Sequence, residues 1–187
     1  MKYKKYLVKI SQPIKSFNHT INVDSDKSIS IRSFLIGSIS HDISKISNAL
    51  NSEDVQSTII CLKSLGVKIK KTSEQNYDVY GKGLGSLMAT KKTSLNFGNS
   101  GTLARLLIGI LTSTPNIKIK MQGDHSLNKR SMEKLIKCMS EFGAKFIPKK
   151  KYKFPLTMIS SDMPVAIEYK AGVSAQLKSA VILSALN

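Results

Sequence analysis

The stretch Asn99-Ser-Gly-Thr-Leu-Ala-Arg-Leu-Leu-Ile-Gly109 decides the fold prediction, because it joins a small polar cluster to an apolar helix. Asn, Ser and Thr side chains favour the first turn of a helix, where they can accept hydrogen bonds from free backbone N–H groups. The residues that follow, Leu103–Leu111, are apolar nearly all round, which is typical of a helix buried on every side. We therefore expect a helix over Thr102–Ser113 that lies inside the protein.

The same pattern occurs twice more, at a period of roughly 72–77 residues. Upstream, Asp26-Lys-Ser-Ile-Ser-Ile-Arg32 leads into Phe34-Leu-Ile-Gly37, and downstream, Val173-Ser-Ala-Gln-Leu-Lys178 leads more loosely into Val181-Ile-Leu-Ser184. We therefore expect three copies of one unit, over residues 14–86, 87–160 and 161–187. Because the third copy stops after its first helix, we expect the chain to be part of a longer protein.

Each copy reads as strand, helix, strand, helix, strand, strand. In the first copy we expect a strand at His19–Val23, a helix at Ser28–Ser40, a strand at Ser44–Ser47, a helix at Ser52–Leu65 and a hairpin of Val67–Lys71 with Tyr77–Tyr80. Asn51 or Ser52 would cap the second helix and Gly66 would end it.

In the second copy, after the helix at Thr102–Ser113, we expect a strand at Ile117–Met121, a helix at Lys129–Phe142 and a hairpin of Ala144–Ile147 with Leu156–Ile159. In the third copy, Ala180–Leu186 is again apolar on nearly all sides. The first helix of each copy should therefore be inside and the strands outside. The predicted class is α/β, with βαβαββ repeats, buried helices and outer sheets.

The charge of the chain is unusual, since 29 basic residues against 12 acidic ones give a formal net charge of +17. A strongly basic chain indicates anionic partners, such as nucleic acid, a membrane surface or small phosphorylated and carboxylated molecules. A genome that favours lysine codons explains the same excess, because all but three of the basic residues are Lys. The exceptions, Arg32, Arg105 and Arg130, suggest sites that need the bidentate guanidinium fork.

Other features exclude several classes of protein. The two cysteines, Cys61 and Cys138, lie far apart without partners at metal-ligand spacing, which argues against a disulfide scaffold and a zinc knuckle. No apolar run reaches the ~18–20 residues of a membrane span. The basic start, Met1–Ile10, has no apolar stretch of a secretory signal behind it. We expect a protein of the reducing cytoplasm.

The polar clusters at the three helix starts are candidate anion sites, because a helix N-terminus offers free N–H groups and the positive end of a dipole. Lys27, Ser28 and Arg32 belong to the first cluster, Gly101 to the second, and Ser174 and Gln176 to the third. Gly101 has no side chain, so a ligand can approach its backbone closely. Ordinary helix capping is the simpler explanation for one cluster, but three at equivalent positions favour a shared site.

These residues resemble a known family. Asp26–Arg32, Ser47-Asn-Ala-Leu-Asn-Ser-Glu-Asp54, Phe97–Arg105, Gly123-Asp-His-Ser-Leu-Asn-Lys-Arg130 and Ser174–Ser179 are similar, in the same order, to motifs of the 5-enolpyruvylshikimate-3-phosphate synthases. The resemblance runs from about Ile14 to Asn187 and covers the first half of that family's enzyme. It implies an inside-out α/β barrel of the enolpyruvyl transferase type, with residues 14–187 as a truncated N-terminal domain. Residues 1–13 would supply a strand to a second domain.

The resemblance also implies a reaction and its residues. The enolpyruvyl group of phosphoenolpyruvate would be transferred to the 5-hydroxyl of shikimate 3-phosphate, with no metal or organic cofactor. By position in the motifs, shikimate 3-phosphate would bind Lys27, Ser28, Arg32, Ser174 and Gln176, and phosphoenolpyruvate would bind Lys27, Gly101, Arg130 and Gln176. Lys27 would be catalytic, and Asn99 and Arg105 would support the site. The family is inhibited by glyphosate at the phosphoenolpyruvate position.

Several readings compete with this one. A UDP-N-acetylglucosamine enolpyruvyl transferase has the same fold, but typically carries Asn at the position of Ser28. A nucleic-acid-binding module would explain the charge, yet aromatic residues are only 6% and no stacking platform is apparent. The expected partners are therefore small anionic substrates and a second domain, with no nucleic acid or membrane, in an enzyme that is monomeric when complete. The chain alone would be an inactive half.

Overall fold

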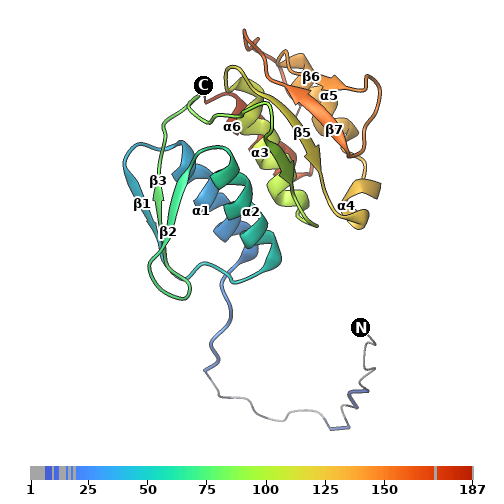
Figure 1. The fold of residues 1–187 in the computed structure, drawn as a ribbon. Helices are drawn as coiled ribbons and strands as arrows, with labels where there is room; N and C mark the ends of the chain where they lie inside the picture. Colours follow the sequence, from blue (N-terminus) through green and yellow to red (C-terminus); the bar gives the residue numbers. More distant parts are fainter. Residues whose placement is uncertain are drawn as a thin grey trace.

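The structure, a computed structural model, describes residues 7–9, 11–12, 16, 18, 20–170 and 172–186. Two sheets form the outer layers of Figure 1, and helices α1, α2 and α3 lie between them. One sheet has three strands in the order β1-β3-β2, and the other has four in the order β4-β5-β7-β6. This arrangement confirms the predicted α/β class with inner helices and outer strands.

The first sheet and its helices follow the expected order. Helix α1 (Lys27–Ile39) leads to β1 (Ile43–Ile46), α2 (Glu53–Ser64), β2 (Lys68–Lys71) and β3 (Tyr77–Tyr80). Strand β3 pairs antiparallel with both β1 and β2, so the predicted hairpin is confirmed. Ser52, rather than Asn51, caps α2, since its hydroxyl accepts a hydrogen bond from the backbone N–H of Val55. Gly66, at φ +85°, follows the helix.

The second sheet belongs to the next repeat. Its elements are β4 (Ser94–Asn96), α3 (Gly101–Ser113), β5 (Lys118–Gln122), α4 (His125–Lys129), α5 (Glu133–Glu141), β6 (Lys145–Ile147) and β7 (Leu156–Ile159). Strand β4 is parallel to β5, whereas β5 and β6 are antiparallel to β7. The hairpin of β6 and β7 is confirmed, and the last helix is α6 (Ala175–Ser184).

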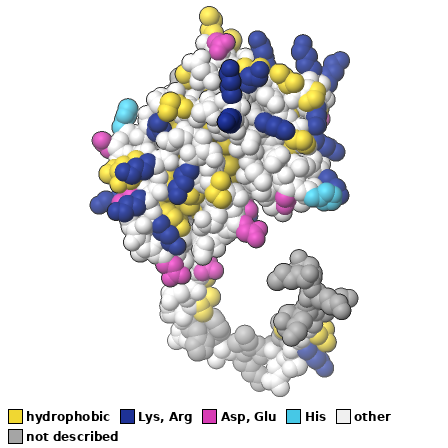
Figure 2. Space-filling view, in the orientation of Figure 1, with side chains coloured by type: hydrophobic (Ala, Val, Ile, Leu, Met, Phe, Trp, Pro, Cys, Tyr) yellow, Lys and Arg dark blue, Asp and Glu magenta, His cyan; other side chains and the backbone are white. Residues whose placement is uncertain are grey.

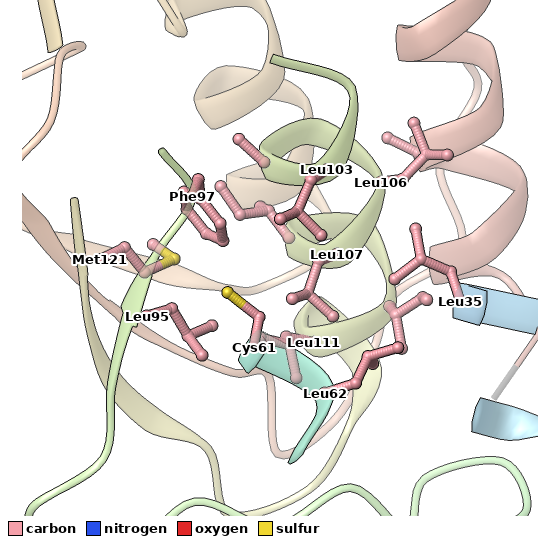
Figure 3. Packing of buried hydrophobic residues seen from close by; sticks show 14 of the residues in the cluster. Leu35, Cys61, Leu62, Leu95, Phe97, Leu103, Leu106, Leu107, Leu111 and Met121 are labelled. Atoms are coloured by element: carbon pink, nitrogen blue, oxygen red, sulfur yellow. The ribbon is translucent and has the colours of Figure 1, made fainter. Parts of the chain in front are cut away.

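Helix α3 lies at the centre of the hydrophobic core. Every residue of α3 except Arg105 is buried. In Figure 3, leucines of α3 lie between Phe97 and Leu95 on one side and Leu35 of α1 on the other, with Cys61 and Leu62 of α2 nearby. These neighbours come from the first repeat as well as from the second, so the burial of α3 joins the two repeats into one core.

Burial differs among the three first helices. The prediction that the helices over Leu103–Leu111 and Ala180–Leu186 are enclosed on every side holds for α3 but is wrong for α6, where Ile182 is 63% exposed and the following Leu186 is 46% exposed. Helix α1 likewise leaves Ile29 and Ile36 exposed. The physical reason is that only α3 has packed neighbours on all sides, whereas α6 packs mainly on α3 through Leu177, Ala180 and Leu183.

One predicted strand differs from the structure. The strand expected at His19–Val23 is absent from its described residues, 20–23, where Ile21 and Val23 are 69% and 80% exposed. Its counterpart β4 buries Leu95, so burial of a side chain on the core supports one strand and not the other. The strand expected over residues 1–13 lies mostly outside the described residues, as does His19.

The helix expected at Lys129–Phe142 is interrupted. Helix α4 ends at Lys129, Arg130 is extended at ψ 138°, and α5 begins only at Glu133. The backbone N–H of Met132 donates to the carbonyl of Tyr152 at 2.8 Å instead of continuing a helix. This contact to the loop between β6 and β7 separates the two helices, so the prediction that Arg130 begins a helix is wrong.

The surface carries the excess charge without one dominant patch on the face in view. Figure 2 shows Lys and Arg side chains spread over both repeats on this face, with hydrophobic side chains between them. No helix among the described residues is both long enough and apolar enough to cross a membrane.

The close contact of α3 with α6 generates a stability prediction. A Cβ atom on Gly109 would lie 2.5 Å from the carbonyl oxygen of Ala180 and 2.8 Å from its Cα. We expect Gly109→Ala to lower the free energy of unfolding by about 1–3 kcal/mol, as overpacking does, despite the better helix propensity of Ala. Urea unfolding measures it. Gly172→Ala is the control, since nothing lies within 4 Å of its Cβ position; equal stability of the two variants would contradict the close contact.

Candidate anion-binding site

Three helix N-termini are capped as their sequences predict. The side chains of Asp26, Ser100 and Ser174 each accept a hydrogen bond from the backbone N–H three residues later, at 2.7, 3.2 and 3.3 Å. These caps satisfy one N–H group each, so further N–H groups of α1, α3 and α6 remain available at the positive ends of the helices.

A pocket of about 550 Å³ lies where α1, α2, α3 and α6 approach one another. It is strongly polar and contains three cations and two carboxylates. Its lining residues are Lys27, Glu53, Asp54, Asn99, Gly101, Thr102, Arg105, Arg130 and Gln176. The pocket brings together all four residues predicted for phosphoenolpyruvate and both predicted supporting residues. Their roles stay predictions.

Arg105 connects α3 with α6. Its Nη1 donates to the carbonyl of Gly101 at 3.0 Å and to Oε1 of Gln176 at 2.9 Å. The amide nitrogen of Gln176 in turn donates to the hydroxyl of Thr102 at 2.8 Å. Since both ends of the Gln176 amide are held by α3, its orientation is set before any ligand arrives.

Arg130 enters the pocket from the segment after α4. Its guanidinium donates to the side-chain oxygen of Asn99, to the backbone carbonyl of Asn99 at 3.5 Å and to the hydroxyl of Ser126 at 3.2 Å. Asp124 caps α4 and buried Leu127 anchors it, which places Ser126 beneath the arginine. The guanidinium is therefore oriented by neutral groups only.

The two guanidinium groups face each other without a counter-ion. Burial, and then the positive charge of Arg130, lower the pKa of Arg105. Within the part of the chain that the structure describes, neither arginine has a carboxylate at ion-pair distance. An arginine side chain stays protonated in proteins, so the pair creates a positive potential that an anion would relieve.

Gly101 lies directly below these two arginines. A Cβ atom there would be 2.7 Å from Nη1 of Arg105 and 3.4 Å from Nη1 of Arg130. Gly101 is the first residue of α3 and does not have a positive φ. Its lack of a side chain is therefore explained by the close approach of both guanidinium groups, and not by a turn that only glycine can adopt.

Lys27 is the pocket cation that does have a carboxylate partner. Its Nζ lies 3.0 Å from Oδ2 of Asp54, with the lysine side chain 50% exposed and the aspartate 16% exposed. Asp54 belongs to the first turn of α2, where the helix dipole stabilises a negative charge.

Three predicted residues lie outside the pocket. Arg32 contacts the carbonyl of Ser28 and the hydroxyl of Ser179, both at 3.3 Å, so it joins α1 to α6. Ser174 is exposed at the start of α6 and lines a smaller pocket of about 280 Å³ on the other side of Arg105. Ser28, Arg32 and Ser174 were all predicted for shikimate 3-phosphate, which would therefore extend beyond the pocket.

Sequence reasoning missed some of the residues that shape the site. Thr102 and Ser126 hold Gln176 and Arg130, and Glu53 and Asp54 line the pocket. Thr102, Ser126 and Asp54 all lie inside the motifs quoted above, but their types also suit ordinary caps and first turns. Only the tertiary contacts distinguish the two roles. No group of three or more His, Cys, Asp or Glu within the described ranges could hold a metal ion.

Comparison with known proteins identifies the family and agrees with the fold. The family model described as EPSP synthase (3-phosphoshikimate 1-carboxyvinyltransferase) matches residues 11–187, so the chain belongs to the EPSP synthase family. The 3-phosphoshikimate 1-carboxyvinyltransferase of Petrotoga mobilis is 40% identical over 176 residues, covering 93% of this chain, and that of Novosphingobium aromaticivorans is 39% identical over 168 residues, covering 89%.

Solved structures agree with this family assignment. EPSP synthase from Acinetobacter baumannii superposes with a TM-score of 0.81 at 32% identity and covers 89% of this chain. The chain spans 40% and 38% of the length of the two curated relatives, and 37% of the chain of the solved structure. The family assignment favours the enolpyruvylshikimate-phosphate synthase interpretation of the sequence over a nucleic-acid-binding module.

Proposed function

We propose that this chain forms one half of the active site of a 3-phosphoshikimate 1-carboxyvinyltransferase. The enolpyruvyl group of phosphoenolpyruvate is transferred to the 5-hydroxyl of shikimate 3-phosphate, and phosphate is released. The observation that carries the proposal is a pair of arginines close to Gly101 at the N-terminus of α3, Arg105 and Arg130, which have no carboxylate partner among the described residues. It lies in a chain whose family has this activity.

The two substrates share Lys27 and Gln176 in this proposal and differ in their other contacts. Phosphoenolpyruvate occupies the pocket near Gly101, in contact with Lys27, Arg130 and the amide of Gln176. Shikimate 3-phosphate extends from Lys27 and Gln176 toward Ser28, Arg32 and Ser174. Preorganised cations and N–H groups neutralise both anions and stabilise the tetrahedral intermediate in which they are joined.

The remaining groups come from a second domain in this proposal. It contributes the acidic proton-transfer residues and further cations, and no cofactor is needed. The complete enzyme acts as a monomer in the cytoplasm, without nucleic acid or membrane partners. The alternative, a UDP-N-acetylglucosamine enolpyruvyl transferase, would be favoured by transfer to UDP-N-acetylglucosamine in place of shikimate 3-phosphate.

The first prediction tests the reaction. We expect the 187-residue chain alone to have no measurable turnover, since it supplies only part of the substrate clamp. Joined to the remaining part of the Petrotoga mobilis relative, it should release phosphate from phosphoenolpyruvate only when shikimate 3-phosphate is present. Phosphate release measures both. Steady-state turnover by the chain alone would contradict the need for a second domain, and a folded chimera that neither binds shikimate 3-phosphate nor releases phosphate would contradict the proposed function.

The second prediction concerns Arg130. Lysine keeps the charge but loses the fork that reaches Asn99, Ser126 and an anion together. We expect Arg130→Lys in the chimera to lower kcat/KM for phosphoenolpyruvate by an amount worth roughly 1.5–3 kcal/mol, or about 10- to 150-fold. The matched control is Lys129→Arg, at the exposed neighbouring position. Unchanged kinetics for Arg130→Lys would remove Arg130 from the site.

The third prediction concerns Gly101. A methyl group there meets the guanidinium of Arg105 first and takes up space below Arg130. Glyphosate reaches slightly further toward this residue than phosphoenolpyruvate does, so we expect Gly101→Ala to weaken the inhibitor much more than the substrate. The ratio of the glyphosate inhibition constant to the KM for phosphoenolpyruvate measures the effect. An unchanged ratio in a folded variant would place Gly101 outside the phosphoenolpyruvate position.

A further inference from the structure

The ion pair of Lys27 with Asp54 is the one feature of the pocket that the proposed roles leave unexplained. Lys27 lies at the start of α1 and Asp54 in the first turn of α2, so the pair joins two helices across the edge of the pocket. A carboxylate beside a lysine that must meet an anion lowers the local positive charge. The pair therefore works against anion binding unless it has another effect.

That effect is a fixed position for the lysine ammonium. Lysine has a flexible four-carbon side chain, and half of the Lys27 side chain is exposed. Asp54 is short, mostly buried and held on a helix that Ser52 caps and that packs into the core through the adjacent Val55. The rigid partner therefore decides where Nζ of Lys27 lies.

Glu53 provides an internal comparison. It is the neighbouring acidic residue in the same turn of α2, and it lines the same pocket. Glu53 is exposed, and within the described residues it forms no ion pair. The two carboxylates thus contribute similar charge to the pocket, but only Asp54 contacts a pocket cation.

We infer that Asp54 is a positioning residue, which holds the Lys27 ammonium at the edge of the pocket so that it is ordered before the anionic substrate binds. This inference rests on the proposed function. Ordering a long side chain in advance removes a cost that substrate binding would otherwise meet, which is worth a several-fold change in affinity. Loss of the Asp54 charge should therefore weaken binding, although it makes the pocket more positive.

The experiment compares Asp54→Asn with Glu53→Gln in the chimera with the Petrotoga mobilis relative, which supplies the rest of the substrate clamp. Each variant removes one negative charge from the same helix turn. Titration with phosphoenolpyruvate, followed by NMR, should give a dissociation constant about three- to tenfold higher for Asp54→Asn than for Glu53→Gln. Without ligand, relaxation of the Lys27 side-chain Cε should show greater mobility in Asp54→Asn only. Equal dissociation constants and equal mobility in the two variants would overturn the inference.

A second comparison separates positioning from a general structural role. In a Lys27→Met background, Asp54→Asn should no longer weaken binding, since no ammonium remains to be positioned. A loss that persists there would overturn the inference. Asp54→Glu keeps the negative charge and should recover part of the affinity for phosphoenolpyruvate. If this variant is as stable to urea as the parent and recovers no affinity, the result would count against the inference. If the parent chimera does not bind phosphoenolpyruvate while Lys27 is ordered by Asp54, the proposed function fails instead.

Discussion

The burial of α3 is the constraint on which the rest of the structure depends. A helix that is apolar nearly all round can be stable in water only when other elements cover every side of it. Elements of the first two repeats and α6 cover α3, so the repeats are packed around one shared helix. The single partly exposed side chain of α3, Arg105, lies at its N-terminal end, where the covering elements leave the pocket open.

The position of the pocket follows from this packing. Helices whose first turns meet at one place bring their free N–H groups and dipoles together, and each first turn adds a polar side chain. Hydrogen bonds hold the guanidinium groups of half-buried Arg105 and exposed Arg130, and Gly101, Asn99, Ser126 and Gln176 supply the neutral acceptors. The two arginine charges are thus held in place without being neutralised, which favours the binding of an anion.

Sequence reasoning predicted the repeats, most helices and both hairpins, because those depend on local periodicity and on caps such as Ser52. It failed where a long-range contact decides the outcome. The break after Lys129 depends on a hydrogen bond to Tyr152, and the missing strand at residues 20–23 depends on whether its side chains are covered. The motifs were sufficient to select Lys27, Gly101, Arg130 and Gln176 as candidate site residues. The contact between Lys27 and Asp54 could not be predicted, because each residue is also typical of the start of a helix and nothing in the sequence shows that the two meet.

The polar contacts of α6 have a consequence for how the chain responds to ligands. This helix leaves Ile182 exposed, and it is attached to α3 through Gln176 and to α1 through Ser179. Gln176 belongs to the proposed substrate contacts, so an anion in the pocket would bind only while α6 is docked. By thermodynamic linkage, ligand occupancy then protects α6 against local opening, and the amide hydrogens of α6 report on whether the pocket is occupied.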